Sequence, residues 1–240
     1  MEEFIAGRNA VAEALKSSRP ADSLFVAQGD TKGLGEIIKL AKATGVVIKD
    51  AKREKLAQLC GSEHHQGVVL SVAARAYADL EDLFAIAQQK SEAPFFVVCD
   101  EIEDPHNLGA IIRTAEAAGA HGVIVPKRRS APLSQTAAKA SAGAIEHLAV
   151  ARVANIAQTL EQLKARGLWI YGADMQGVPH SEQKLEGSIA LVIGSEGRGL
   201  GRLVKERCDV LLALPMRGHV NSLNASVAAG ILLYEMMKWR

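Results

Sequence analysis

Three loops of this chain combine polar or charged residues with the end of an apolar segment, and each is a candidate ligand site. The first is DEIEDPHNLGAIIRTAEAAG, residues 100–119. We expect a helix to begin near Ala110 with Asn107 as its cap, which places Arg113 in the first turn. A cation there opposes the helix dipole, so an anion is expected nearby. Glu116 is one candidate, but the planar guanidinium of Arg113 also suits a phosphate group of a ligand.

The second loop, LVIGSEGRGLG at residues 191–201, is rich in glycine. A glycine-rich turn after a strand suggests a phosphate loop, but this one lacks the lysine of GxxxxGK[ST] and contains no GxGxxG. Glu196 within it would repel a phosphate. The loop therefore favours a backbone cradle for a neutral or zwitterionic nucleoside, in which Glu196 orients a polar group. An ordinary tight turn is the alternative.

The third loop follows LPMRG and ends at an almost entirely apolar helix expected over residues 225–237. Ser222 and Asn224 stand at the start of this helix, and either could cap it. One cap does not need several such residues, and burying polar groups costs free energy unless they find partners. This surplus indicates that at least one of them reaches a ligand or another loop.

The elements that carry these loops are strands that are apolar throughout, as in a parallel sheet covered by helices on both faces. The expected strands are FFVVCD, HGVIVP, LWIYGAD, IALVIG and VLLALP, alternating with helices such as NIAQTLEQLKARG, which Asn155 is expected to cap. This order predicts an α/β fold. In such sheets ligands bind at the carboxyl ends of the strands, where the three loops lie.

The first part of the chain reads as a smaller α/β unit that is nearly neutral in charge. Its expected strands are SLFVAQ, VVI and QGVVLSVA, with helices between them. We place this domain at residues 1–74, a charged, partly helical linker at 75–91 and the larger domain at 92–240.

Composition limits the classes of function. The 240 residues carry a net charge of +1, which neither requires nor excludes a nucleic acid partner. Cys60, Cys99 and Cys208 lie far apart and suggest neither a metal site nor disulfides, which fits a reducing compartment. The N-terminus does not resemble a signal peptide, and no apolar segment is long enough to span a membrane. We therefore expect a cytoplasmic protein without a metal or a membrane partner.

Taken together, the three loops resemble the SpoU (TrmH) family of RNA ribose 2′-O-methyltransferases, within the SPOUT superfamily. Its motifs are similar, in order, to residues 107–115 (NLGAIIRTA), 191–197 (LVIGSEG), and 214–216 (LPM) followed by 222–226 (SLNAS). GRNAVAEAL and HHQGVVLSVA are similar to the ends of the ribosomal-protein-L30e-like substrate domain of the longer members, and KASAGAIEHL also resembles the family. The resemblance covers the whole chain and is strongest to bacterial enzymes that methylate a guanosine ribose in 23S rRNA of the large ribosomal subunit.

The resemblance implies a parallel-sheet domain whose C-terminal segment passes through a loop to form a deep trefoil knot, a feature that no pattern in the sequence would suggest. It also implies S-adenosylmethionine as the cofactor. By the same resemblance, backbone groups near six residues hold its adenosine: Gly172, Ile193, Gly194, Leu214, Met216 and Leu223.

The resemblance further implies that Arg113 acts at the ribose 2′-hydroxyl, as a base or through a neighbouring phosphate. Because arginine is a poor base, we favour a role as a phosphate anchor or in charge stabilisation. Four further residues would position the ribose and the loops: Asn107, Glu196, Ser222 and Asn224. The implied partners are ribosomal RNA, bound in part by phosphate contacts from Arg8, Lys127, Arg128 and Arg129, and a second copy of the chain, packed through the C-terminal helix.

Other functions remain open at this point. The substrate could be tRNA, and the same fold could serve as a non-catalytic RNA-binding or ribosome-assembly factor. A nucleotide- or NAD-dependent enzyme using GSEGRGLG is disfavoured by the missing lysine and by the position of the loop near the C-terminus.

Overall fold

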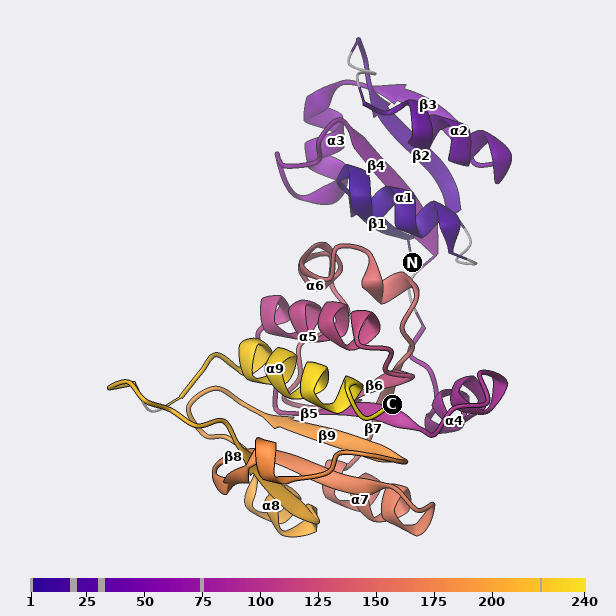
Figure 1. The fold of residues 1–240 in the computed structure, drawn as a ribbon. Helices are drawn as coiled ribbons and strands as arrows, with labels where there is room; N and C mark the ends of the chain where they lie inside the picture. Colours follow the sequence, from indigo (N-terminus) through magenta and orange to yellow (C-terminus); the bar gives the residue numbers. More distant parts are fainter. Residues whose placement is uncertain (1, 18–20, 30–32, 74–75, 221) are drawn as a thin grey trace.

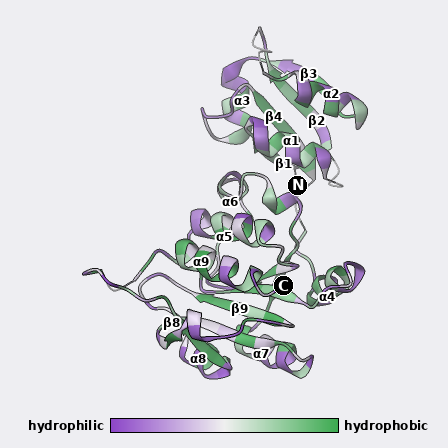
Figure 2. Ribbon diagram, viewed as in Figure 1, coloured by the Kyte–Doolittle hydropathy of each residue, from purple (hydrophilic) through white to green (hydrophobic). Residues whose placement is uncertain are grey.

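The computed structural model describes residues 2–17, 21–29, 33–73, 76–220 and 222–240. They form two α/β units, each built on its own sheet (Figure 1). Figure 2 shows hydrophobic residues along β9 and hydrophilic ones on exposed turns of helices such as α3 and α7.

The N-terminal unit has a four-stranded sheet in the order β1-β4-β2-β3. Its elements are β1 (Glu2–Ala6), α1 (Arg8–Lys16), β2 (Ala21–Ala27), α2 (Gly35–Ala43), β3 (Val47–Ala51), α3 (Arg53–Cys60) and β4 (Val68–Ala73). Strands β2 and β3 are parallel, whereas β4 is antiparallel to both β1 and β2. A core that includes Val11, Leu24 and Leu70, all fully buried, lies between the sheet and helices α1 and α2.

The C-terminal unit has a six-stranded sheet in the order β10-β8-β9-β5-β6-β7. Its strands are β5 (Phe95–Asp100), β6 (Gly122–Pro126), β7 (Val150–Val153), β8 (Trp169–Pro179), β9 (Ile189–Gly194) and β10 (Val210–Ala213). All of the pairings are parallel, and every residue of β5, β6 and β9 is buried. The predicted α/β fold with a parallel sheet is therefore confirmed, whereas the trefoil knot stays a prediction.

Helices cover both faces of this sheet (Figure 1). They are α4 (Leu80–Gln89), α5 (Pro105–Ala117), α7 (Ile156–Ala165), α8 (Arg202–Arg207) and α9 (Ala225–Met237). Helix α6 (Gln135–Ala140) packs on α5 instead, and two short 3-10 turns are η1 (Ala144–Glu146) and η2 (His180–Glu182). One apolar cluster joins α5 and α9 to the sheet through residues such as Ile111 and Leu232. A second cluster joins α4, α7 and α8 to the opposite face through residues such as Leu83, Leu160 and Val204.

Helix α5 begins earlier than the sequence suggested, so the expected start near Ala110 is wrong. Asp104 is the cap, because its side chain accepts a hydrogen bond from the backbone N–H of His106 at 3.0 Å, and Pro105 occupies the first turn. Proline suits that position, since its missing N–H would have no helical partner there. Asn107 thus lies inside the first turn, and Arg113 lies in the second half of the helix, where the expected conflict with the dipole does not arise.

The segment expected to be a linker contains α4, which packs against the larger sheet. Leu83 is fully buried in that unit's core, and Arg166 of α7 pairs with Glu81 while stacking over the ring of Phe84. The proposed boundary between residues 74 and 75 lies outside the described residues.

The two units touch where α6 meets β1 and where α1 meets the turn after α6. His147 lies with its Nε2 atom 2.7 Å from the Glu13 carboxylate, and this contact with the one from Lys16 lowers the pKa of Glu13. Gly143 has φ +95°, and a Cβ there would lie 2.7 Å from Cβ of Glu13. The close approach therefore depends on glycine at position 143, as expected where a left-handed conformation leaves no room for a side chain.

A buried histidine ties the start of β5 to the chain just before β6. The side chain of His121 is fully buried; its Nδ1 accepts the backbone N–H of Phe95 at 3.1 Å, and its Nε2 lies 3.0 Å from a carboxylate oxygen of Glu92. Burial lowers the pKa of His121, and Lys90 and Arg240 act in the same direction, whereas the hydrogen bond and the charge of Glu92 act against this fall; the pKa remains lowered overall. The imidazole is therefore held in its neutral form.

This arrangement predicts a stability that falls in mild acid. Because the pKa of His121 is lower in the folded than in the unfolded chain, its contribution is complete above about pH 6.5 and is lost as the pH falls. In the wild type, the free energy of unfolding should fall as the pH is lowered from 7.5 to 5.5. We expect His121→Asn to make this pH dependence shallower, by up to about 1.4 kcal/mol per pH unit. Urea unfolding at both pH values measures the free energy of unfolding of each variant. The exposed His64, changed to Asn, should keep the wild-type slope, and an equal slope in His121→Asn would contradict the assignment.

Candidate active site

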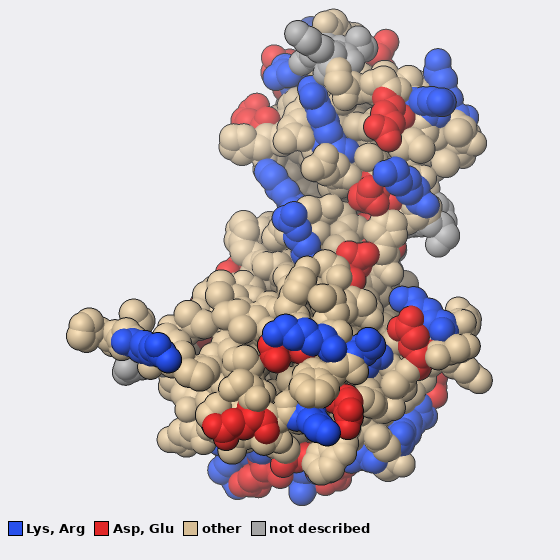
Figure 3. All heavy atoms as spheres, in the orientation of Figure 1, with Lys and Arg blue, Asp and Glu red and all other residues tan. Residues whose placement is uncertain are grey.

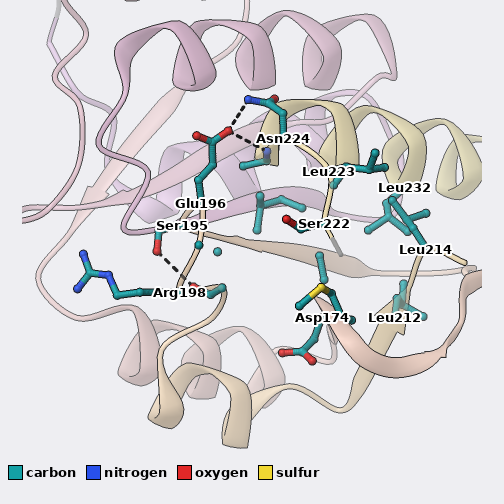
Figure 4. Close-up of a pocket in the computed structure, with 18 of the residues that line it drawn as sticks. Asp174, Ser195, Glu196, Arg198, Leu212, Leu214, Ser222, Leu223, Asn224 and Leu232 are labelled. Atoms are coloured by element: carbon teal, nitrogen blue, oxygen red, sulfur yellow. Dashed lines mark hydrogen bonds between the residues drawn. The ribbon is translucent and has the colours of Figure 1, made fainter. Parts of the chain in front are cut away.

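A cavity of about 510 Å³ opens at the carboxyl ends of the strands of the larger sheet. Its walls come from the loop after β9, part of β8, and the segment that joins β10 to α9 (Figure 4). The predicted site residues that line it are Ile193, Gly194, Glu196, Leu214, Met216, Ser222, Leu223 and Asn224. Gly172, Asn107 and Arg113 are not among the described lining residues. The second and third loops thus meet around one space large enough for a small molecule.

The loop after β9 folds back on its own strand. Ser195 and Gly199 exchange two backbone hydrogen bonds of 3.1 and 2.9 Å, and Gly197 and Gly199 both have positive φ. A Cβ on Gly194 would lie 2.2 Å from the carbonyl carbon of Gly199. The turn can therefore close only with glycine at position 194, and its backbone forms one wall of the cavity.

An excursion within β8 forms the opposite wall. In the pairing with β10, Leu211 faces Gly172 but Leu212 already faces Val178, so residues 173–177 leave the ladder. Ala173, Asp174, Met175 and Gln176 line the cavity from this excursion. Gly172 lies just before it, where a Cβ would meet Sγ of Cys208 at 2.7 Å.

An ion pair holds this excursion to α8. Nζ of Lys205 lies 2.9 Å from a carboxylate oxygen of Asp174 and donates to Oε1 of Gln176 at 3.3 Å. None of these three residues is predicted from the sequence as part of the site. Gly177, whose added Cβ would lie 2.3 Å from the Leu211 carbonyl oxygen, is the sequence signal for the close approach of β10.

Asn224 connects all three loops. Its Oδ1 caps α9 by accepting the backbone N–H groups of Ser226 and Val227 at 2.9 and 3.2 Å. Its Nδ2 donates to Oδ1 of Asn107 at 2.9 Å and to Glu196, as Figure 4 shows for the latter. Asn107, on α5, is itself buried. The surplus of polar residues before α9 is therefore explained in part by contacts between loops.

A buried carboxylate supports the far end of the glycine-rich loop. Asp100, the last residue of β5, is 6% exposed and accepts the backbone N–H of Gly201 at 2.7 Å. Burial raises the pKa of Asp100, and the Gly201 hydrogen bond acts against that rise. The sequence marks Asp100 only as the end of a strand, so this role is visible only in the folded chain.

Arg113 lies exposed on α5. Among the described residues it makes no hydrogen bond or ion pair, and the alternative pairing with Glu116 is not formed. Its guanidinium is therefore available to an anion from outside the described chain.

The predicted RNA contacts lie in two places. Lys127, Arg128 and Arg129 follow β6 and are exposed, and Arg129 donates to Glu101 at 2.7 Å. Arg8 lies at the start of α1 in the other unit, where its Nε donates to the Gln66 carbonyl at 3.4 Å. Figure 3 shows basic side chains on both units of the visible face, interspersed with acidic ones.

Neither a metal-binding cluster nor a membrane-spanning helix is found among the described residues. No group of three or more His, Cys, Asp or Glu residues there could hold a metal ion. In the same part of the chain, no helix has the length and apolar character needed to cross a membrane.

Comparison with known proteins gives the family. Residues 94–234 match the SpoU rRNA Methylase family, and residues 4–78 match the domain described as RNA 2′-O ribose methyltransferase substrate binding. The chain is 53% identical over 241 residues to YacO of Bacillus subtilis (strain 168), which is named as a TrmH family tRNA/rRNA methyltransferase; the match covers 99% of this chain and 96% of that protein.

Solved structures agree with this result. The SpoU methyltransferase AviRb from Streptomyces viridochromogenes, crystallised with AdoMet, has a TM-score of 0.83 at 26% identity and is matched over 99% of this chain and 89% of its own. An AdoMet-bound rRNA methyltransferase from Sinorhizobium meliloti has a TM-score of 0.81 at 26% identity, with 99% and 87% coverage. The expected cofactor is thereby confirmed. The chain belongs to the SpoU (TrmH) family of S-adenosylmethionine-dependent RNA methyltransferases.

Proposed function

We propose that this protein methylates the ribose 2′-hydroxyl of a guanosine in 23S rRNA. One observation supports the assignment to ribose. The N-terminal unit matches the substrate-binding domain of RNA 2′-O ribose methyltransferases, and the same chain carries the cavity lined by Gly194. The choice of a large-subunit rRNA guanosine rests on the resemblance of the three loop motifs. We expect it to act on this RNA in the cytoplasm.

The lining of the cavity fits the cofactor. Leu212, Leu214, Leu223 and Leu232 supply apolar surface suited to an adenine ring, and Asp174 and Ser222 supply polar groups beside it (Figure 4). The backbone of the turn at residues 194–199 offers the close approach that glycine permits. We assign the adenosine to backbone groups near Gly172, Ile193, Gly194, Leu214, Met216 and Leu223.

The protein residues would act by position and charge. When bound, S-adenosylmethionine supplies a methyl group already activated by its sulfonium. The ribose 2′-hydroxyl is a weak nucleophile and must lose its proton as it reacts, so its orientation and the charge around it decide the rate. Arg113 would hold an RNA phosphate beside the reacting ribose, because an arginine side chain does not release its proton in a protein. Four further residues would position the loops and the ribose: Asn107, Glu196, Ser222 and Asn224.

The RNA backbone would be held by basic residues of both units. We propose phosphate contacts from Lys127, Arg128 and Arg129 near the cavity and from Arg8 on the substrate-binding domain. Such contacts add affinity that depends on salt and not on sequence.

The substrate is tested by mapping methylated riboses. RNA from a strain that lacks this protein should miss one 2′-O-methylguanosine in 23S rRNA, and the purified protein should restore it in vitro. Loss of a methyl group from tRNA would instead identify the tRNA enzyme of the same family. No lost methyl group, together with impaired ribosome assembly, would identify a non-catalytic factor.

We also propose that two copies associate through α9. One face of this helix is buried through Leu232, Leu233 and Met236, yet the other exposes large apolar side chains: Val227 50%, Ile231 42%, Tyr234 47% and Met237 39%. An exposed apolar surface of this kind is typical of an interaction site. Family resemblance favours a second copy of the chain as the partner.

Charge placed on this face should separate the copies. We expect the wild type to sediment as a dimer at micromolar concentration and the double variant Ile231→Glu, Tyr234→Glu to sediment as a monomer, since buried charges without partners are costly. The matched control is Leu203→Glu on α8, another exposed apolar residue, which should stay dimeric. A wild-type monomer with full activity would rule the dimer out.

A further inference from the structure

Three charged side chains meet beside the cavity from loops that follow adjacent strands. Arg198 follows β9, Glu101 follows β5 and Arg129 follows β6, and these strands are neighbours in the sheet. Nη1 of Arg129 donates to Oε1 of Glu101 at 2.7 Å, and Nη1 of Arg198 lies 3.8 Å from Oε2 of the same carboxylate. One acidic group thus lies between two guanidiniums.

The backbone fixes all three positions. Glu101 and Arg129 have φ of 58° and 55°, a left-handed conformation that non-glycine residues adopt rarely. Arg198 stands at the tip of the turn closed by the paired hydrogen bonds between Ser195 and Gly199. The β5 and β6 loops are joined by a 2.8 Å hydrogen bond from the Ala131 N–H to the Ile102 carbonyl. The charges are therefore placed by the folded loops rather than by flexible side chains alone.

The exposure of the three groups differs. The side chain of Glu101 is 25% exposed, whereas those of Arg129 and Arg198 are 67% and 72% exposed. The carboxylate thus lies beneath two guanidiniums that face solvent. Figure 4 shows Arg198 on the side of the cavity opposite Leu214 and Leu232, directed away from that apolar wall.

Arg129 and Arg198 have N–H donors that Glu101 does not use. Each guanidinium has five N–H donors, and the contact of Arg198 with Glu101 is longer than a hydrogen bond. The carboxylate of Glu103 also acts on Arg129, so what the site offers a phosphate is free N–H donors rather than a net positive charge. Exposed ion pairs contribute little and exchange readily, so an arriving phosphate can take over donors that Glu101 now holds.

We propose that Arg129 and Arg198 form a binding site for a phosphate of the RNA backbone at the edge of the cavity, with Glu101 as a built-in competing anion. In the free protein Glu101 occupies a donor of Arg129 and lies against Arg198. It thereby weakens the binding of RNA that the rest of the surface does not fit. This inference rests on the proposed RNA substrate and adds Arg198 and Glu101 to its binding surface.

The test compares RNA binding and cofactor binding in the same variants. Filter binding over a range of salt would use a 23S rRNA fragment and an unrelated RNA of equal length, and calorimetry would measure S-adenosylmethionine. Arg198→Ala and Arg129→Ala should each weaken binding of both RNAs several-fold and lower the salt slope by about 0.7. Glu101→Gln should strengthen binding several-fold, more for the unrelated RNA, and Glu101→Gln combined with Arg198→Ala should lose most of that gain.

A matched control removes an equivalent carboxylate elsewhere. Glu161 on α7 pairs with Arg207 at 2.9 Å, as Glu101 pairs with Arg129, so Glu161→Gln should bind RNA as the wild type does. Unchanged or weaker RNA binding in Glu101→Gln would overturn the proposal. So would an Arg198→Ala variant that loses affinity for S-adenosylmethionine while its RNA binding is unchanged, because Arg198 would then serve the cofactor.

The outcome is separable from that of the proposed function. If the wild type methylates rRNA but Glu101→Gln has no effect on RNA binding, only the phosphate site is wrong. If the binding pattern holds but no ribose is methylated, the phosphate site stands and the proposed reaction is wrong.

Discussion

Replacing Arg113 with alanine is expected to slow single-turnover methyl transfer to rRNA by about a hundredfold or more, while S-adenosylmethionine affinity and stability stay near wild type. Arg113 is exposed and lies outside the described cavity lining, so its removal costs the folded chain no described hydrogen bond or ion pair. What the variant loses is the charge that we assign to the RNA backbone beside the reacting ribose. Arg113→Lys should recover only part of the rate, because an ammonium lacks the two-pronged geometry of the guanidinium.

Calorimetry of cofactor binding beside rapid-quench methyl transfer measures both properties in the same preparation. Glu116→Ala provides the control, since Glu116 lies exposed on the same helix and does not pair with Arg113. It should methylate at nearly the wild-type rate. Normal turnover in Arg113→Ala would remove Arg113 from the reaction.

Substituting Gly194 by alanine is expected to remove most of the affinity for S-adenosylmethionine. The added Cβ would lie 2.2 Å from the carbonyl carbon of Gly199 and 2.4 Å from the backbone nitrogen of Leu200. Backbone atoms cannot move aside as a flexible side chain can, so the turn at residues 195–199 must shift. Overpacking of this kind costs about 1–3 kcal/mol; if the displaced turn is the cofactor wall, affinity should fall by about ten- to a hundredfold.

The control for Gly194→Ala is an alanine where the chain has room. Gly35 begins α2, and a Cβ there meets nothing within 4 Å, so Gly35→Ala should bind the cofactor normally. Circular dichroism checks that both variants keep their fold. Wild-type cofactor affinity in a folded Gly194→Ala would show that this turn does not form the binding wall.

Buried strands and helix caps could be predicted from the sequence, because residues close together in the chain determine them. β5 and β9 are apolar at every position except Asp100 and Gly194 at their ends, and continuous apolar runs of this kind belong in a buried parallel sheet. Asn155 caps α7 as its side-chain type predicts, with Oδ1 accepting the N–H of Gln158 at 3.0 Å. Because ligands bind at the carboxyl ends of parallel strands, the strand directions also predict the edge of the sheet at which the cavity lies.

Other features depend on partners far away in the sequence. β1 and β7 are not among the strands expected from the sequence; β7 has only four residues, VARV, and gains its place by pairing with β6. The shifted register between β8 and β10, which carries Asp174 to the cavity, is fixed by the approach of Leu211 to Gly177. No periodicity within either strand encodes such a contact.

The start of α5 differs from these features, because the local sequence does contain a signal for it. Asp-Pro at residues 104–105 is a cap followed by a residue suited to the first helical turn, yet Asn107 is also a good cap by type. In the fold Asn107 is buried and bonds to Asn224. Residue type alone does not separate a cap from a side chain that joins two loops.

The chemical position of the transferred methyl group tests the central claim most directly. Purified protein, 23S rRNA without the modification and S-adenosylmethionine carrying a labelled methyl group would be incubated, and the RNA then hydrolysed in alkali. Alkaline cleavage uses the ribose 2′-hydroxyl as its nucleophile, so a 2′-O-methylated nucleotide stays linked to its neighbour. We expect the label in one alkali-stable dinucleotide that begins with guanosine. Label in ordinary mononucleotides would mean that a base is methylated and would contradict the proposed function.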